Sequence, residues 1–179
     1  LAGVEVCRVF AGFGPARHYI PTEIYNQVAD QLRILGEHAA AHNQVIAVEN
    51  HGGVSATAAQ VRRLVETAGS PAVKANYDPA NFAHHKEDPL GAWLTLRELV
   101  GYTHWKDIRL VDDKPEYCAL GDGVTDWDPV IHAMLRDGYA GYWTLEYEEP
   151  ADVVEGTQKC MKVIQESVAR YYRAAQQSA

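Results

Sequence analysis

Four residues with side chains that can bind a metal ion lie in or directly after short, strand-like stretches of the sequence. They are Glu49, Asp78, His104 and Glu146. Successive members of this set are 29, 26 and 42 positions apart. Since the unit that leads from one parallel strand through a helix to the next takes about 30 residues or more, this spacing predicts that all four residues reach the same end of one sheet.

The chemistry of such a cluster is that of a divalent metal site. Three carboxylates that converge on one point repel one another and take up protons unless a cation neutralises them. Three oxygen ligands with one imidazole nitrogen suit Mn²⁺, Mg²⁺ or Co²⁺ best, with Zn²⁺ as a further candidate. The sequence therefore predicts one divalent metal ion held by these four side chains.

Each of the four residues alone has a simpler explanation. Glu49 fits a salt bridge at the rim of a sheet, Glu146 is likewise an isolated acid after apolar residues, and Asp78 fits a cap of the following turn. His104 is expected on the same strand face as Tyr102 and Lys106, where it would be a hydrogen-bonded core residue. Only the combination of the four favours a metal site.

Strands and helices are expected to alternate along the whole chain. Runs rich in β-branched and aromatic residues predict strands at 4–11, 45–50, 73–78, 102–107 and 142–147. Helical spacing of apolar residues predicts helices at 22–35, 61–68, 88–99, 126–137 and 152–172, followed by a frayed tail at 176–179. This alternation predicts a single α/β domain over residues 1–179, in which ligands bind at the carboxyl ends of parallel strands.

Composition limits the class of partner. The formal net charge of −8 and a pI near 5.4 argue against nucleic acid, because such binding draws on clustered Lys and Arg. A small neutral or phosphorylated ligand is expected instead. No apolar run is long enough to span a membrane. The cysteines Cys7, Cys118 and Cys160 are widely spaced without a CxxC pair, which predicts reduced thiols and a cytoplasmic location.

Five motifs in this order resemble the sugar phosphate isomerases and epimerases of the xylose isomerase-like TIM barrel superfamily. They are Val48-Glu49-Asn50-His51-Gly52-Gly53, Tyr77-Asp78-Pro79-Ala80-Asn81-Phe82, His104-Trp105-Lys106-Asp107, Leu120-Gly121-Asp122-Gly123 with Asp126-Trp127, and residues 138–146 ending in Glu146. The resemblance implies a partial (β/α)8 barrel in which the four ligands lie on strands five to eight and residues 4–11 form strand four. Strands one to three are then absent from the sequence, and another segment or a further copy in a homo-oligomer is expected to close the barrel.

The same resemblance implies a metal-dependent isomerase or epimerase that acts on a sugar, sugar phosphate or keto-sugar through an enediolate. Glu49 and Glu146 are the expected acid and base, while Asp78 and His104 mainly hold the ion. Three alternatives stay open: a lyase, a C-glycoside-cleaving subunit, and a non-catalytic barrel segment. A metal-dependent nuclease fits less well, because the chain is acidic.

Several neighbours of the four ligands are expected to contact substrate. These are His51, Asn81, Lys106 and Asp107, although Lys106 and Asp107 fit an ion pair at the rim equally well. Some epimerases of the family have a histidine three positions after the aspartate ligand, where this chain has Asn81. The Gly121-Asp122-Gly123 segment fits either a loop that closes over a ligand or a plain turn. The pair His84-His85 is expected in a surface loop rather than at a second metal site.

Overall fold

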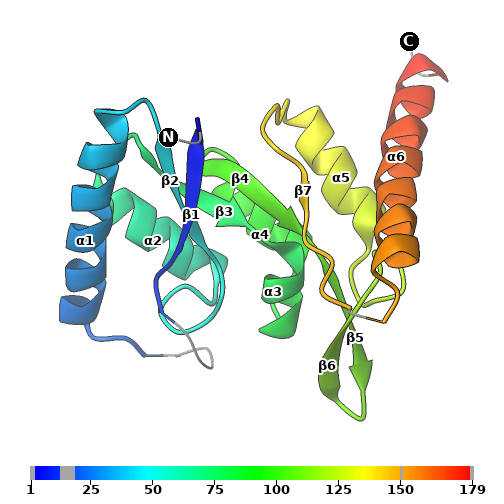
Figure 1. Cartoon of the computed structure of the whole chain (residues 1–179), viewed down its shortest axis with the longest axis horizontal. Coiled ribbons are helices and arrows are strands. Elements are labelled where there is room, and N and C mark those ends of the chain that lie inside the picture. Colours follow the sequence, from blue (N-terminus) through cyan, green and yellow to red (C-terminus); the bar gives the residue numbers. More distant parts are fainter. Residues whose placement is uncertain (1–2, 13–18, 150, 178–179) are drawn as a thin grey trace.

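The main element of the structure is a five-stranded parallel sheet in the order β1-β2-β3-β4-β7 (Figure 1). The structure is a computed structural model and describes residues 3–12, 19–149 and 151–177. The strands of the sheet are Val6–Phe10 (β1), Val45–Glu49 (β2), Val73–Tyr77 (β3), Val100–Trp105 (β4) and Thr144–Leu145 (β7). The expected parallel sheet with these five strands is confirmed.

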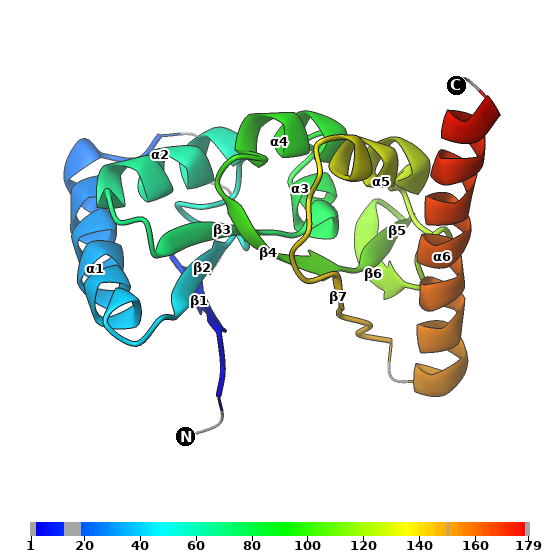
Figure 2. The same cartoon turned by 90° about the horizontal axis from the view of Figure 1, so that it is seen from above.

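Helices cover one side of the sheet. They are Thr22–Ala40 (α1), Ala58–Ala68 (α2), Pro79–His84 (α3), Pro89–Leu96 (α4), Trp127–Arg136 (α5) and Val153–Gln177 (α6). Figure 2 shows α1, α2, α4 and α5 arranged around the convex side of the curved sheet, with α6 beside α5. The five strands therefore form a curled half-barrel whose concave side faces away from these helices.

Alternation along each strand separates the core from the concave side. Ile46 and Val48 of β2 and Ala75 and Tyr77 of β3 belong to the apolar core. Successive strand residues point to opposite faces, so Glu49 of β2 points away from that core. The same alternation places His104 opposite the buried Trp105 on β4, which is how a polar row arises on an otherwise apolar sheet.

Local signals explain where several helices begin and end. Thr57 and Gln60 form a capping box at the start of α2, and Gly69 ends that helix with a φ of 63°. Asp88 caps α4 through the backbone N–H groups of Leu90 and Gly91. The predicted end of α2 and the predicted start of α4 are confirmed, whereas α2 begins three residues before its predicted start at residue 61.

The hairpin after β4 was not expected from the sequence. Asp107–Val111 (β5) and Lys114–Cys118 (β6) pair antiparallel, so the predicted strand at 102–107 instead begins at Val100 and ends at Trp105. The two turn residues, Asp112 and Asp113, have φ values of 50° and 60°, as the tight turn of a two-residue hairpin requires. The hairpin strands are mostly exposed, and their charged residues hide the alternation that would have predicted them.

Three further expectations were wrong in detail. The predicted strand at 142–147 shrinks to two residues, because β7 pairs only with β4 among the described residues. Residues 79–84 form a short helix that starts with proline in its first turn, so His84 is helical rather than in a loop. The expected fraying at 176–179 is contradicted at residues 176 and 177, which belong to α6, while 178 and 179 lie outside the described residues.

The three cysteines are unpaired, with Cys118 and Cys160 buried and Cys7 exposed. Among the described residues, the helices are all too short or too polar to span a membrane.

Candidate metal centre

The four predicted ligands come together at one rim of the half-barrel. Glu49, Asp78, His104 and Glu146 each offer one ligand atom, and these atoms lie within 4.8 Å of one another. Glu49 ends β2, Asp78 directly follows β3, His104 lies near the end of β4, and Glu146 directly follows β7. The predicted convergence of these side chains at the carboxyl ends of successive strands is therefore what the fold produces.

Asp78 serves two purposes at the start of α3. Its Oδ1 accepts a hydrogen bond from the backbone N–H of Asn81 at 3.2 Å, so it caps that helix. Its Oδ2 lies 3.1 Å from Asn81 Nδ2 and 3.2 Å from Lys106 Nζ. The simpler reading of Asp78 as a cap is thus correct for one oxygen, while the other oxygen faces the cluster.

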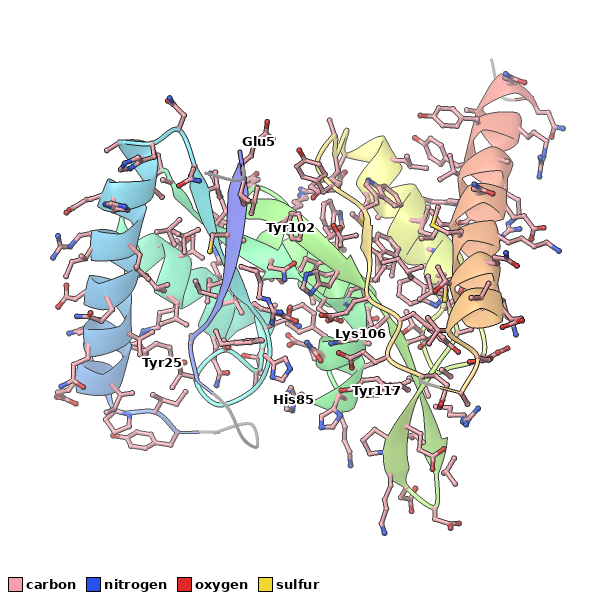
Figure 3. The ribbon with its side chains drawn as sticks, viewed as in Figure 1. Glu5, Tyr25, His85, Tyr102, Lys106 and Tyr117 are labelled. Carbon is pink, nitrogen blue, oxygen red and sulfur yellow. The ribbon has the colours of Figure 1, made fainter. Side chains whose placement is uncertain are left out.

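Two cations already neutralise part of the carboxylate charge. Lys106, labelled in Figure 3, is 97% shielded from solvent. Its Nζ lies 2.8 Å from Glu146 Oε2 and 3.2 Å from Asp78 Oδ2. Arg8, on β1, donates a hydrogen bond of 3.0 Å to Glu49 Oε2 and stacks over the ring of Phe10 at 4.2 Å. Sequence reasoning missed Arg8. The signal available was its place in the expected strand at 4–11, at an alternating position between apolar residues.

His104 has a buried nitrogen that suits a metal ion. Its Nδ1 has no hydrogen-bond partner among the described residues, although it lies 3.3 Å from Glu146 Oε2 and 3.5 Å from Glu49 Oε1. A buried polar atom without a partner is costly. A divalent cation between the nitrogen and the carboxylates would satisfy it, so the donor set fits one such ion with these four residues as ligands.

The same contacts shift the proton affinities of the ligands. Burial opposes the charged form of His104, but Glu146 and Glu49 outweigh burial and raise its pKa to about 9. Burial raises the pKa of Asp78 to about 7 against the effect of Lys106. Burial by itself would raise the pKa of Glu146, but His104 and Lys106 outweigh burial and lower this pKa to about 2. Without a metal ion, the cluster therefore holds a proton on His104 at neutral pH.

Metal affinity is expected to depend on pH for this reason. His104 must lose its proton before the nitrogen can bind an ion, so the apparent affinity for Mg²⁺ should rise about tenfold per pH unit between pH 7 and the pKa of His104 near 9. Titration calorimetry of the metal-free protein, repeated in buffers of different ionisation enthalpy, would count the protons released. Equal affinities at the two ends of this range, with no proton release, would contradict the expectation.

Two of the four predicted substrate-binding residues, Asn81 and Lys106, contact the cluster. Asn81 Nδ2 lies 3.1 Å from both Glu49 Oε1 and Asp78 Oδ2. His51 packs edge-on against Phe10 at a ring distance of 4.7 Å. Lys106 lies within the cluster, as described above. Contact with substrate remains a proposal for Asn81, His51 and Lys106.

Asp107 is not brought to the cluster, which corrects its prediction as a substrate-binding residue. Its fully buried carboxylate accepts hydrogen bonds from Trp127 Nε1 and from the backbone N–H groups of Ile108, Gly121 and Thr125. The expected rim ion pair with Lys106 is not formed either, since the ammonium of Lys106 contacts other carboxylates. Alternation along the chain explains why Lys106 faces the cluster and Asp107 does not, because adjacent residues point to opposite faces.

The Gly121-Asp122-Gly123 segment is a packed turn. A side chain at Gly123 would lie 2.2 Å from Asp107 Oδ1 and 2.3 Å from the carbonyl oxygen of Ile108. The carboxylate of Asp122 accepts a hydrogen bond from Lys159 Nζ of α6. Of the two readings, the plain turn agrees with these contacts.

Replacing His84 and His85 together with Ala is expected to leave the metal content unchanged. His84 is exposed, and His84 and His85 are absent from the four-residue cluster. Elemental analysis of the purified double variant beside the wild type would check this. A loss of bound metal would mean that the site had been placed wrongly.

A cavity at the other end of β4 lies away from the cluster. It has a volume of about 640 Å³ and is lined by Trp93, Arg97, Val100 and residues 137–141, at the amino-terminal end of β4. It contains none of the four ligands. The cavity is therefore separate from the candidate metal centre at the rim.

Comparison with known proteins supports the fold. A family model described as xylose isomerase-like TIM barrel matches residues 2–166. The chain is 24% identical over 153 residues to an inosose dehydratase of Lacticaseibacillus casei, which covers 76% of this chain and 51% of the relative. An inosose dehydratase of Clostridium tetani is 26% identical over 166 residues, or 82% of this chain and 56% of the relative. The chain thus spans about half the length of the curated relatives it matches.

Solved structures share the fold at low sequence identity. A xylose isomerase domain protein from Planctomyces limnophilus superposes with a TM-score of 0.77 at 23% identity, covering 97% of this chain and 62% of the other. An L-ribulose 3-epimerase gives 0.76 at 19% identity, with 96% and 64% covered. A xylose isomerase-like TIM barrel protein from Mycobacterium smegmatis, in complex with magnesium, gives 0.75 at 14% identity, with 94% and 63% covered.

Proposed function

This chain belongs to the xylose isomerase-like TIM barrel family, and on that premise we propose that it catalyses divalent-metal-dependent proton transfer next to the carbonyl group of a carbohydrate. The observation on which the proposal depends is the cluster itself: four ligand atoms within 4.8 Å of one another, with a buried histidine nitrogen that lacks a hydrogen-bond partner. When bound there, the cation would polarise the substrate's oxygen atoms and stabilise negative charge that develops on them.

Glu146 is the proposed base. It is the most exposed of the four ligands, with 25% of its side chain accessible, so a substrate can reach it. Its low pKa keeps it ionised at neutral pH, and the hydrogen bond from Lys106 Nζ fixes the orientation of its carboxylate. A carboxylate held in this way can accept a proton from a carbon atom next to a carbonyl.

Glu49 is proposed to act from the opposite side. Its carboxylate is fully buried and is held by Arg8 at Oε2 and by Asn81 at Oε1. Two glutamates on either side of one substrate carbon would allow a proton to leave from one face and return on the other. Such a transfer interconverts epimers, and a transfer to the neighbouring carbon interconverts an aldose and a ketose.

Loss of water is a second candidate outcome, favoured by the similarity to inosose dehydratases. The first step would be the same, because a proton leaves the carbon next to the carbonyl. The neighbouring carbon–oxygen bond would then break, with the hydroxyl group taking up a proton and leaving as water. Lys106, the buried ammonium beside Glu146, is the nearest donor for that proton.

Completion of the barrel is part of the proposal. The unshared edges of β1 and β7 have no partner strand among the described residues. We propose that a further segment or another copy of the chain covers them, and the mass of the protein in solution, from light scattering, would distinguish the two.

Exchange in heavy water tests the proposed reaction. The Mg²⁺- or Mn²⁺-loaded protein would be incubated with D-fructose, D-tagatose and scyllo-inosose in D₂O, with chelator-treated protein as the control. We expect deuterium next to the carbonyl in at least one substrate, followed either by an epimer or isomer or by a conjugated enone. The absence of both exchange and water loss for all three substrates would contradict the proposal.

A further inference from the structure

The β5–β6 hairpin carries an aromatic side chain to the cluster. Tyr117 of β6 pairs with Ile108 of β5. The centroid of its ring lies 5.8 Å from Lys106 Nζ, within the range of a cation–π contact. Figure 3 shows Tyr117 beside Lys106, at the same rim of the half-barrel. The hairpin is therefore part of the surroundings of the candidate metal centre.

Exposure increases from the cluster towards this hairpin. Glu49 and Asp78 are fully buried, and the side chain of Glu146 is 25% exposed. The side chain of Glu148 is 36% exposed, and Tyr117 is 42% exposed. A ligand that approaches Glu146 along β7 and the hairpin would thus meet Tyr117 and Glu148 on its way.

Three kinds of chemical group meet at this point. Lys106 Nζ lies 3.9 Å from Glu148 Oε1. Both groups affect the pKa of Tyr117. Burial is the main cause that raises this pKa, Glu148 raises it further, and Lys106 lowers it. An aromatic face, a carboxylate and an ammonium therefore lie together beside the ligand that is most accessible.

We propose that Tyr117 and Glu148 form a wall of the substrate pocket and select a polyhydroxylated ligand. The electron-rich face of the Tyr117 ring would pack against C–H groups of a carbohydrate. The Glu148 carboxylate, which can only accept hydrogen bonds, would bind a hydroxyl group. This inference rests on the proposed function, and it adds the part of the pocket that recognises the carbohydrate away from the reacting carbon.

A purely structural role is the alternative. In that case Tyr117 would only cover Lys106, and its removal would disturb the cluster rather than the ligand. Metal affinity separates the two roles, because a wall residue contacts the carbohydrate alone, whereas a covering residue supports the groups around the ion.

The test compares four variants with the wild type, all loaded with Mg²⁺. They are Tyr117→Ala, Tyr117→Phe, Glu148→Gln and, as a matched control, Tyr172→Ala, which removes a 55% exposed tyrosine from α6. The probes are D-fructose and myo-inositol, each observed by saturation-transfer NMR with irradiation of aromatic protons. Calorimetry gives the Mg²⁺ affinity of each protein.

We expect the wild type to transfer saturation to C–H protons of at least one probe. Tyr117→Ala should lose most of this transfer and weaken probe binding about tenfold, while Tyr117→Phe retains the transfer. Glu148→Gln should weaken binding several-fold. The Mg²⁺ affinity of all four variants should stay within about threefold of the wild type.

Three results would overturn the inference: transfer that persists in Tyr117→Ala, loss of Mg²⁺ affinity in step with loss of probe binding, or no transfer in the wild type. The exchange experiment in D₂O is independent of these results. If exchange occurs but Tyr117→Ala behaves like the wild type, only the wall is wrong. If exchange and water loss are both absent, the proposed reaction itself fails.

Discussion

The Glu146→Gln variant is expected to lose at least about 100-fold in affinity for Mg²⁺ and to show no exchange of deuterium into the substrate. Removal of a hydrogen-bonding partner of a metal ligand costs about 10- to 100-fold in affinity, and loss of a ligand itself should cost more. The amide also lacks the negative charge that pairs with Lys106 and His104, and it is too weak a base to take a proton from carbon. Calorimetry and heavy-water NMR on the same preparation would measure both effects.

Glu148→Gln is the matched control for this variant. Glu148 lies two residues further along the chain, also approaches Lys106 and carries the same charge, but it is not one of the four clustered ligands. Its replacement should change the Mg²⁺ affinity by less than about threefold. Equal losses in the two variants would mean that general negative charge, rather than the specific ligand, attracts the ion.

The sequence was sufficient to predict the cluster because its members occupy equivalent places in repeated units. A parallel sheet brings the carboxyl ends of its strands to one rim, and alternation fixes the face on which each side chain lies. Glu49 and His104 could therefore be placed without knowledge of the loops. Asp78 and Glu146 directly follow their strands, so the same argument held for them.

Contacts that depend on the path of a loop were not predictable in this way. Asp107 belongs to the same short motif as His104 and Lys106, yet its carboxylate binds the turn around Gly121 and the side chain of Trp127. Those donors lie 14 and 20 positions further along the chain. The sequence carries no period that would pair them with Asp107, because the intervening hairpin is short, exposed and charged.

The three carboxylates do not depend on a metal ion alone for neutralisation, contrary to the expectation from the sequence. Arg8 and Lys106 supply two positive charges to the same group of acids, and His104 adds a third when it is protonated. The side chains can thus be held in place before an ion binds. A metal ion that enters must displace a proton from His104 and must compete with the ammonium of Lys106.

Replacing Lys106 with Met is expected to have two opposite effects for this reason. The metal-free protein should lose about 3–5 kcal/mol of stability, because removal of one partner leaves buried carboxylate charge uncompensated. The affinity for Mg²⁺ should rise about tenfold, since a positive charge a few ångströms from the ion is removed. Urea unfolding in the presence of a chelator would measure the first effect and calorimetry the second, both at pH 8. This pH lies above the wild-type pKa of Asp78 near 7, which the loss of Lys106 would raise.

Lys159→Met provides the comparison for the loss of stability. Lys159 pairs with Asp122, and both side chains are nearly half exposed, so its replacement should cost less than about 1 kcal/mol. If Lys106→Met weakens Mg²⁺ binding instead, the ammonium must hold Asp78 and Glu146 in the geometry that the ion needs, and this orienting effect then exceeds the charge repulsion. A stronger affinity together with a less stable metal-free protein would instead identify Lys106 as the counter-ion of the carboxylates in the metal-free protein. The metal ion would then replace the ammonium as their partner, and the ammonium would be free to bind an oxygen atom of the substrate.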